Sequence, residues 1–411
     1  MRNLILKAAR PAFGGLFIGR HEGKVVMIKG ALLPDETVEV TIDDEKKDYI
    51  TASVRKIIEP SPHRIEPACK HFGSCGGCHF QHIPYNLQIQ IKEEILMDCL
   101  KRLAKIETAL SAPLINNNPW NYRLRGQFKA CRGKAGFYRE NSREIVDIDN
   151  CPLMVKEINE SFRKAKYLLK GINIREIHIT AGDSLIALIK APGFKKSAAQ
   201  WNRLASGFLD SGFSGLFVEM KNKKLLRYGD RYTVLPLADL KYTISPMSFF
   251  QSNWGLNRRV VSFIKNNLQP LKGKKVLDLY SGAGNFSIPA AGTEVTAVEG
   301  NPFAIEDGKR NLEINNISNC RFIRSPAADF HSEDRFDIVI LDPPRAGLSN
   351  KGMDKVLTLM PERIVYISCN PSTFARDLRR LTAKYGIESI RMINFFPQTY
   401  HIESLAFLNL R

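Results

Sequence analysis

The sequence predicts three parts: a small N-terminal β-barrel, a mixed α+β middle domain and a C-terminal α/β domain built on a mostly parallel sheet. Three observations predict this order. Short alternating segments with glycine turns open the chain, a cysteine cluster and an amphipathic segment follow, and strands alternate with helical sequence after Ser245. A chain of 411 residues is long enough for two or three domains that each bury a core.

The first part, residues 1–60, reads as an all-β unit. Apolar and polar residues alternate in KVVMIKG and TVEVTID, and glycines and a Pro-Asp pair mark the turns between them. A unit of this length suits an OB-like barrel, which commonly binds nucleic acid. A barrel without a binding role fits the same pattern. Three prolines between residues 60 and 67 then predict a stiff linker.

The middle part, residues 61–242, opens with clustered cysteines and an amphipathic helix near residues 88–105 that can pack on the C-terminal domain. Residues 120–143 follow, with seven Lys or Arg, one acidic residue and five aromatic residues. Cations that reach phosphates, interleaved with rings that stack on bases, are typical of nucleic-acid grooves. The alternative is an exposed basic hairpin whose aromatic side chains face the core.

The last part, residues 243–411, alternates strands with helices and turns, which indicates a mostly parallel sheet. The predicted strands are KKVLDLY, EVTAVEG, CRFIRS, FDIVILD and ERIVYISC. MINFFP and ESLAFLNL are expected to be two late strands with a short connection.

The formal net charge is +18, which favours a polyanionic partner, most commonly nucleic acid, over a merely solvated basic surface. No apolar run approaches the ~18 residues of a membrane span, and Arg2, Lys7 and Arg10 interrupt any signal-peptide core. We therefore expect a cytoplasmic protein that does not enter a membrane. Its eight cysteines then point to metal binding or catalysis rather than to disulfides.

A glycine turn after a predicted strand marks a cofactor site. Gly282 and Gly284 allow a tight turn, but Ser287 stands where a dinucleotide fingerprint needs a third glycine. Asp278 ends the strand before the turn, and Glu299 ends the next strand, where Rossmann-like folds bind ribose hydroxyls. Carboxylates without a phosphate-binding signature favour a cationic nucleoside. We therefore expect S-adenosylmethionine, with a dinucleotide as the alternative.

Two further strand ends, at Asp342 and Cys369, converge on the same crevice. Asn370 can cap the following helix, whose dipole then favours a Cys369 thiolate; an inert buried cysteine is the alternative. Carbon 5 of a pyrimidine becomes nucleophilic only after a thiolate adds to carbon 6, so a methyltransferase with such a cysteine suits a pyrimidine substrate. Glu403 is the favoured base for the carbon 5 proton, and His401 is the alternative.

Six segments match, in order, the motifs of a known family. They are FFQSN (249–253), DLYSGAGNF (278–286), VEGNP (298–302), LDPPRAGL (341–348), SCNPSTFARDL (368–378) and FPQTYHIESL (396–405). Over essentially its whole length the chain resembles the RNA 5-methyluridine (uracil-C5) methyltransferases, specifically the iron–sulfur type that acts on 23S rRNA. The barrel resembles the TRAM domain, an RNA-binding unit.

The resemblance implies that Cys369 is the nucleophile and Glu403 the general base. The donor-binding positions that it implies are Gln251, Tyr280, Asn285, Glu299 and Asp342. One departure concerns the segment before the FPxT element, where the family usually has an acidic residue and this chain has Met-Ile-Asn-Phe at 392–395.

The cysteine cluster has the spacing Cys69-x5-Cys75-x2-Cys78, which supplies three thiolates of a four-ligand site. Spacing alone favours tetrahedral zinc over a 4Fe-4S cluster. The resemblance implies the 4Fe-4S cluster, with Cys151 as the distant fourth ligand. The nearby histidines are alternative ligands: His71, His79 and His82.

The sequence thus predicts a monomeric, S-adenosylmethionine-dependent RNA (uracil-C5-)-methyltransferase that draws a uridine of 23S rRNA out of its stack. A tRNA uridine is the alternative substrate. A non-catalytic RNA-binding scaffold and a cytosine-5 methyltransferase are two further candidates. A cytosine-5 methyltransferase is expected to carry Pro-Cys after the fourth strand, where this chain has Pro343-Pro344-Arg345.

Overall fold

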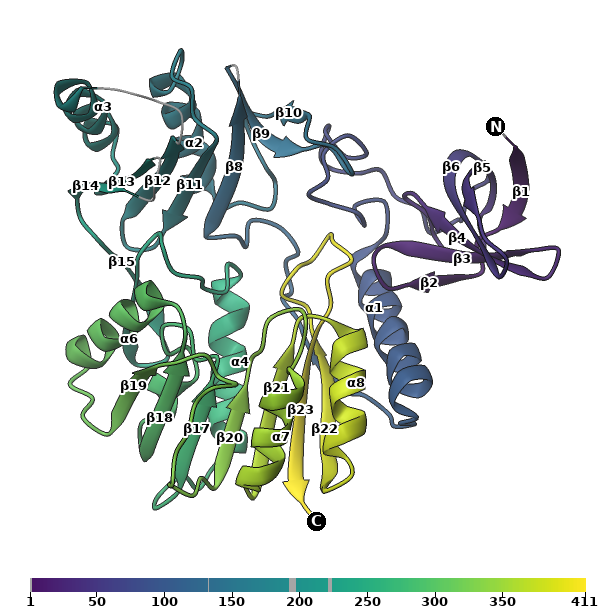
Figure 1. Cartoon of the computed structure of the whole chain (residues 1–411). Helices are drawn as coiled ribbons and strands as arrows, with labels where there is room; N and C mark the ends of the chain where they lie inside the picture. Colours follow the sequence, from purple (N-terminus) through teal and green to yellow (C-terminus); the bar gives the residue numbers. More distant parts are fainter. Residues whose placement is uncertain (1, 132, 192–196, 221–223) are drawn as a thin grey trace.

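The computed structural model describes residues 2–131, 133–191, 197–220 and 224–411. In these ranges the chain forms sheets of six, seven and eight strands and one two-stranded hairpin (Figure 1). Arg132 of the basic stretch 120–143 lies outside the described residues. The boundaries predicted at residues 60 and 242 stay predictions.

The six-stranded sheet contains the N-terminal strands in the order β1-β5-β6-β4-β3-β2. Every second side chain of a strand faces inward, and this places Phe17, Val26, Ile28, Val38 and Val40 in a core of their own. The predicted strands KVVMIKG and TVEVTID form β4 and β5. The strands are β1 (Asn3–Lys7), β2 (Arg10–Ala12), β3 (Leu16–His21), β4 (Lys24–Lys29), β5 (Thr37–Glu45) and β6 (Tyr49–Glu59).

The predicted amphipathic helix is α1 (Tyr85–Cys99), and a short π-helical segment, η1 (Leu100–Ala104), continues it. Its apolar face, including Ile91, Ile95 and Leu96, packs in the same core cluster as residues of the C-terminal sheet. β7 (Ser111–Leu114) then pairs with the edge of that sheet. Residues 85–114 therefore lie against the C-terminal sheet, beside α8 (Figure 1).

The seven-stranded middle sheet has the order β10-β9-β8-β11-β12-β13-β14, and α2 (Lys156–Leu168) and α3 (Ala198–Asp210) accompany it. The basic stretch 120–143 contributes its hairpin β8–β9. Phe128 lies in the core of this sheet, whereas Tyr138 is exposed. The strands are β8 (Arg125–Cys131), β9 (Lys134–Tyr138), β10 (Ile145–Asp147), β11 (Glu176–Ala181), β12 (Leu185–Ala191), β13 (Gly215–Met220) and β14 (Leu225–Gly229).

Arg125 shows that this basic stretch is not only a surface for phosphates. Its guanidinium is buried, donates to the backbone carbonyls of Ser245 and Ser248, and lies 4.5 Å from the ring centroid of Phe250. Arg125 therefore joins the middle sheet to the segment that leads into the C-terminal part. The aromatic side chains of the stretch divide between the core and the surface, so the alternative of a hairpin with its aromatic side chains in the core describes part of it. The nucleic-acid groove stays a prediction.

The eight-stranded sheet has the order β19-β18-β17-β20-β21-β23-β22-β7. Its first five strands pair in parallel, as the sequence predicts, and β23 runs antiparallel to β21. β15 (Thr233–Leu237) and β16 (Leu240–Ile244) form the two-stranded hairpin, which comes before this sheet in the chain. The elements that follow are α4 (Trp254–Asn267), β17 (Lys275–Leu279), α5 (Ser287–Ala290), β18 (Glu294–Glu299), α6 (Pro302–Ile314), β19 (Cys320–Arg324), β20 (Ile338–Leu341), α7 (Asn350–Leu359), β21 (Arg363–Ser368), α8 (Pro371–Leu381), β22 (Tyr385–Ile393) and β23 (Glu403–Leu410).

The prediction that MINFFP is a strand with a short connection to the last strand is wrong in its bounds. β22 ends at Ile393, so the connection to β23 covers residues 394–402. Pro397 has no N–H group with which to continue a ladder, and the side chain of Asn394 binds α1 instead. This connection, the base loop, rises from the sheet toward the middle of the molecule (yellow in Figure 1).

Among the described residues, no helix combines the length and apolar character needed to cross a membrane.

Candidate functional site

One cavity of about 580 Å³, the catalytic cavity, opens at the carboxyl ends of the parallel strands. Every residue that the family resemblance assigns to donor binding or catalysis lines it: Gln251, Tyr280, Asn285, Glu299, Asp342, Cys369 and Glu403. These positions come from six separate segments, which the parallel sheet brings to one edge because its strand ends align. The alternative base, His401, also lines the catalytic cavity.

The glycine turn is held in place by Glu299. The Glu299 carboxylate accepts hydrogen bonds from the backbone N–H groups of Gly282, at 3.0 Å, and Asn301, at 2.7 Å. Gly284 has φ 92°, and a Cβ atom there would meet Ile288 and Phe322 within 3 Å. The turn therefore needs glycine, and the carboxylate keeps lone pairs for a ribose diol.

Asp278 does not lie where the sequence predicts it. It is buried beneath the turn, does not line the catalytic cavity, and accepts a hydrogen bond from the hydroxyl of Ser287. Burial raises its pKa to about 7. The prediction of a second carboxylate facing the donor from this position is therefore wrong. Ser287, at the position of the missing third glycine, instead fixes Asp278.

The polar lining of the catalytic cavity fits S-adenosylmethionine. Gln251 Oε1 and Ser281 Oγ are buried and have no hydrogen-bond partner among the described residues. Buried polar atoms normally have a partner, so these two atoms point to a bound ligand. Asn285 is oriented by a reciprocal pair of hydrogen bonds with Asn257, at 2.7 and 3.0 Å.

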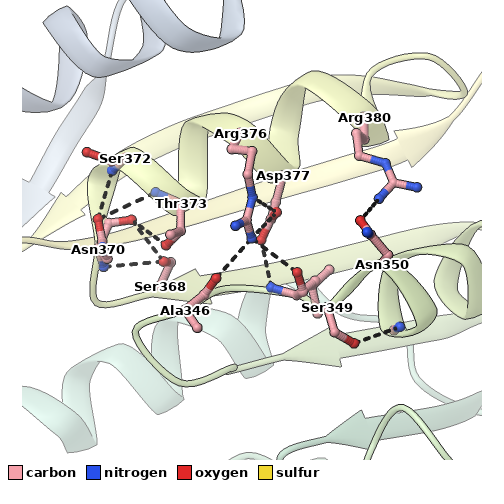
Figure 2. A network of polar contacts seen from close by, with 12 residues as sticks. Ala346, Ser349, Asn350, Ser368, Asn370, Ser372, Thr373, Arg376, Asp377 and Arg380 are labelled. Carbon is pink, nitrogen blue, oxygen red and sulfur yellow. Dashed lines mark hydrogen bonds and ion pairs between the residues drawn. The ribbon is translucent and has the colours of Figure 1, made fainter.

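Cys369 lies directly before the N-terminus of α8, and the predicted cap is present. Asn370 Oδ1 accepts from the backbone N–H groups of Ser372, at 3.0 Å, and Thr373, at 3.4 Å. The Asn370 amide also donates to the carbonyl of Arg345. Arg376 donates to the carbonyl of Ala346 (Figure 2). This network ties α8 to the loop after Asp342, so the positions of Cys369 and Arg345 are fixed together.

The charges around Cys369 oppose its ionisation in the free protein. Burial raises the pKa of Cys369 to about 11, Glu403 and Asp342 contribute to the increase, and Arg345 opposes it. The expectation that the helix N-terminus favours a thiolate is therefore wrong for the protein without its ligands. Desolvation and two acidic neighbours outweigh a dipole whose effect is typically worth ~0.3–1 kcal/mol.

The two carboxyl groups of the cavity are also shifted. Burial raises the pKa of Asp342 to about 7. Burial raises the pKa of Glu403 to about 8, with Asp342 adding to the increase and Arg345 opposing it. A buried carboxyl group with a pKa near neutrality suits proton transfer at physiological pH. By contrast, burial lowers the pKa of His401 to about 3, so its ring is neutral at pH 7.

The base loop is held by buried polar side chains of α1 that the motifs do not include. Lys92 Nζ donates to Asn394 Oδ1, at 2.7 Å, and to the carbonyl of Phe396, at 2.9 Å. Gln88 binds Gln398, one turn earlier on the same helix face. A lysine and a glutamine four residues apart on an otherwise apolar face are the signal that marks them.

The four predicted cluster ligands lie together. A second, mostly apolar cavity of about 80 Å³, the cysteine cavity, is lined by Cys69, Cys75, Cys78 and Cys151. Burial raises the pKa of Cys78 to about 12 and that of Cys151 to about 11. The described residues nevertheless contain no group of three or more His, Cys, Asp or Glu side chains arranged to hold a metal ion.

The alternative histidine ligands differ in position. His71 lines the cysteine cavity. His82 lies 2.9 Å from the carbonyl of Leu32, and the ring of His79 packs on that of Tyr400. Of the predicted and alternative ligands, the four cysteines and His71 therefore line the cysteine cavity, and His79 and His82 do not.

Comparison with known proteins agrees with this geometry. Residues 84–411 match the tRNA (uracil-5-)-methyltransferase family, and residues 5–54 match the TRAM domain. An uncharacterised RNA methyltransferase of Aquifex aeolicus is 35% identical over 99% of each chain. The 23S rRNA (uracil(1939)-C(5))-methyltransferase RlmD of Shewanella amazonensis is 32% identical over 100% of this chain and 96% of its own.

A solved structure has the same architecture. The tRNA (uracil-54, C5)-methyltransferase of Pyrococcus abyssi, in complex with S-adenosyl-L-homocysteine, superposes with a TM-score of 0.78 at 27% identity. The match covers 98% of this chain and 99% of that one. With the family model spanning the site and full-length relatives above 30% identity, the chain belongs to the tRNA (uracil-5-)-methyltransferase family of S-adenosylmethionine-dependent RNA methyltransferases and carries an N-terminal TRAM domain.

Proposed function

We propose that this protein methylates carbon 5 of a specific uridine in 23S rRNA, with Cys369 as nucleophile and Glu403 as general base. One observation carries the proposal: Cys369, Glu403 and the glycine turn after β17, which we call the donor turn, line a single cavity. The rRNA substrate is supported by full-length relatives, at 31–32% identity, that are named 23S rRNA (uracil(1939)-C(5))-methyltransferase RlmD.

In this proposal Cys369 Sγ forms a bond to carbon 6 of the uracil, and the electron pair of the C5–C6 double bond moves toward carbon 5. When bound, S-adenosylmethionine would supply an electrophilic methyl group to that carbon, and its sulfur would keep the electron pair of the broken S–CH3 bond. Glu403 then takes the carbon 5 proton, the double bond re-forms, and Cys369 leaves as a thiolate. Gln251 and Ser281 offer the unpartnered oxygens, and Glu299 the ribose contact, that hold the donor.

The donor's charge also explains how a site with a raised thiol pKa becomes active. Cys369, Asp342 and Glu403 each stay protonated more readily in the free protein. A cation beside them favours their charged forms. A sulfonium and an ammonium group bound in the cavity would therefore oppose these increases in pKa, so that ionisation would follow donor binding.

We further propose that Cys69, Cys75, Cys78 and Cys151 hold a 4Fe-4S cluster. Their common cavity and its mostly apolar lining suit such a group. The cluster would stabilise residues 69–80, the cysteine loop. The N–H groups of His79 and Phe80 in this loop donate to the carbonyl of Gln398 in the base loop. Anaerobic purification should give a brown protein with four irons per chain for such a cluster. A colourless protein with stoichiometric zinc would contradict the assignment.

A tRNA uridine is the second candidate, because the solved tRNA methyltransferase covers 98% of this chain. The decisive experiment maps 5-methyluridine by mass spectrometry in rRNA and tRNA from a deletion strain and its complemented control. Loss of the modification at one 23S rRNA uridine supports the proposal. Loss confined to tRNA supports the second candidate, and unchanged RNA contradicts both.

A further inference from the structure

A third cavity, of about 690 Å³, lies beside the catalytic cavity, and His401 lines both. We call it the flanking cavity. Arg123 and three segments line it: Gly76, Gly77 and His79 of the cysteine loop, residues 138–143 of the basic stretch and residues 399–401 of the base loop. The volume is within the ~300–1,000 Å³ of small-ligand sites. The mechanism proposed above uses none of the residues that line only this cavity.

Aromatic rings connect the two cavities. The ring of Tyr400 lies 4.4 Å from that of His79 and 4.6 Å from that of His401. The His401 ring in turn lies 5.6 Å from Phe396, which lines the catalytic cavity. Burial lowers the pKa of His401 to about 3, so the ring that lines both cavities is uncharged at pH 7. The rings between the cavities therefore offer flat faces on which bases can stack.

The rest of the lining is cationic. Arg123, Arg139 and Arg143 line the flanking cavity, and Glu140 is its single carboxylate among the described residues. Arg139 is paired with Glu144 at 3.0 Å, whereas Arg143 is exposed. Buried Arg123 Nε has no hydrogen-bond partner among the described residues, and its guanidinium lies 5.5 Å from the Phe396 ring centroid. Rings beside arginines are the combination that binds single-stranded nucleic acid.

We propose that the flanking cavity binds a second unpaired nucleotide of the RNA, a neighbour of the target uridine. The base stacks on the tyrosine rings of the lining, Tyr138 and Tyr400, and the phosphate lies against Arg139 and Arg143. This inference rests on the proposed function, since a target uridine must occupy the adjoining cavity. Because a stacking site tolerates every base, it adds affinity and register rather than base identity.

The test combines exposed variants with abasic RNA. Tyr138→Ala and Arg143→Ala remove groups that are exposed in the lining. Tyr167→Ala and Arg203→Ala are matched controls, because both side chains are exposed on α2 and α3 and neither lines a cavity described here. The RNA is the transcript that the wild-type enzyme methylates, with one flanking nucleotide at a time replaced by an abasic residue. Binding is measured by fluorescence anisotropy, and kcat and KM are measured separately.

We expect one flanking abasic position to weaken wild-type binding by roughly 10-fold. Tyr138→Ala should weaken binding of intact RNA to a similar extent, with kcat and S-adenosylmethionine affinity unchanged, and the abasic change should then cost little more. Additive losses, or no sensitive flanking position, would overturn the proposal. So would weakening by Arg143→Ala alone, which indicates backbone contacts without a base. Failure of the wild-type enzyme to methylate the intact transcript would count against the proposed function instead.

Discussion

The side-chain amide of Gln88 forms two hydrogen bonds with Gln398, accepting from its backbone N–H at 3.0 Å and donating to its side-chain oxygen at 2.9 Å. The carbonyl of Gln398 also accepts from the N–H groups of His79 and Phe80, at 2.8 and 3.0 Å. α1, the cysteine loop and the base loop thus meet at one residue. Because Glu403 follows the base loop directly, these contacts hold the base in place.

Cys369→Ala should abolish methyl transfer, because no other side chain described in the catalytic cavity is a thiol. S-adenosylmethionine affinity should remain near that of the wild type, since the turn residues are untouched. The measurement is transfer of labelled methyl to RNA, with calorimetry for the donor. Cys131→Ala, at an exposed cysteine outside the cavity, is the control. Turnover by Cys369→Ala would disprove the covalent mechanism.

Glu403→Gln should slow turnover by about 10²–10⁴-fold, the usual contribution of a general base. Methyl transfer precedes proton removal, so a methylated RNA–protein adduct should accumulate and be visible on a denaturing gel. Transcript containing 5-fluorouracil should trap the same kind of adduct on the wild-type enzyme. Normal turnover by the variant would remove Glu403 from the role of base, and His401→Gln would then be tested in the same assay.

The contribution of Glu403 and Asp342 to the stability of the donor-free protein should fall as the pH rises from about 4.5 to about 8. The folded pKa of Glu403 is about 8 and that of Asp342 about 7, against ordinary values of 4.5 and 3.8. Between these limits the two carboxyl groups bind more protons in the folded than in the unfolded state, so their contribution to the free energy of unfolding falls with pH.

Glu403→Gln removes one of these groups, so the variant should unfold at a higher temperature than wild type at pH 8. At pH 4.5, where the wild-type carboxyl is protonated, the two proteins should differ much less. Thermal unfolding at both pH values measures this difference. An equal difference at the two pH values would show that Glu403 is not a desolvated acid.

Lys92→Met should lower kcat and stability together. The side-chain nitrogen of Lys92 is buried and bonded to Asn394 Oδ1 and to the carbonyl of Phe396. Its loss leaves Asn394 Oδ1 unpaired, at ~1–3 kcal/mol, whereas the Phe396 carbonyl keeps the hydroxyl of Thr399 as a donor. S-adenosylmethionine affinity should persist, because the donor turn lies on other segments. Lys101→Met, at an exposed lysine of the adjoining η1, is the control. A variant with wild-type kcat would show that the base loop does not need this contact.

For the proposed 4Fe-4S cluster, Cys151→Ser should remove the brown colour and most of the iron expected with it, because the other three cysteines would leave one corner of the cluster without its ligand. RNA affinity should fall, because the cysteine loop lines the flanking cavity, whereas donor affinity should stay near wild type. Cys320→Ser, at a buried cysteine elsewhere, tests whether losing any buried thiol has the same effect. Full iron content in Cys151→Ser would exclude this residue as a ligand.

Features that are local or repeated along the chain could be predicted from its residues. Period-two and strand–helix patterns predicted the parallel strands β17–β21, and the Asn370-Pro371 pair predicted the cap of α8. The family resemblance implied the residues that line the catalytic cavity. The pattern of strands by itself brought Asp342 and Cys369 to one crevice, because parallel strands bring their carboxyl ends to one edge whatever lies between them.

Tertiary packing, in contrast, determines which polar groups lose water and what they contact. It places Asp278 beneath the turn, surrounds Cys369 with two acidic groups, and joins Gln88 and Lys92 to a loop about 300 residues away in the chain. Desolvation and long-range hydrogen bonds depend on how distant segments pack. No local pattern in the sequence carries that information.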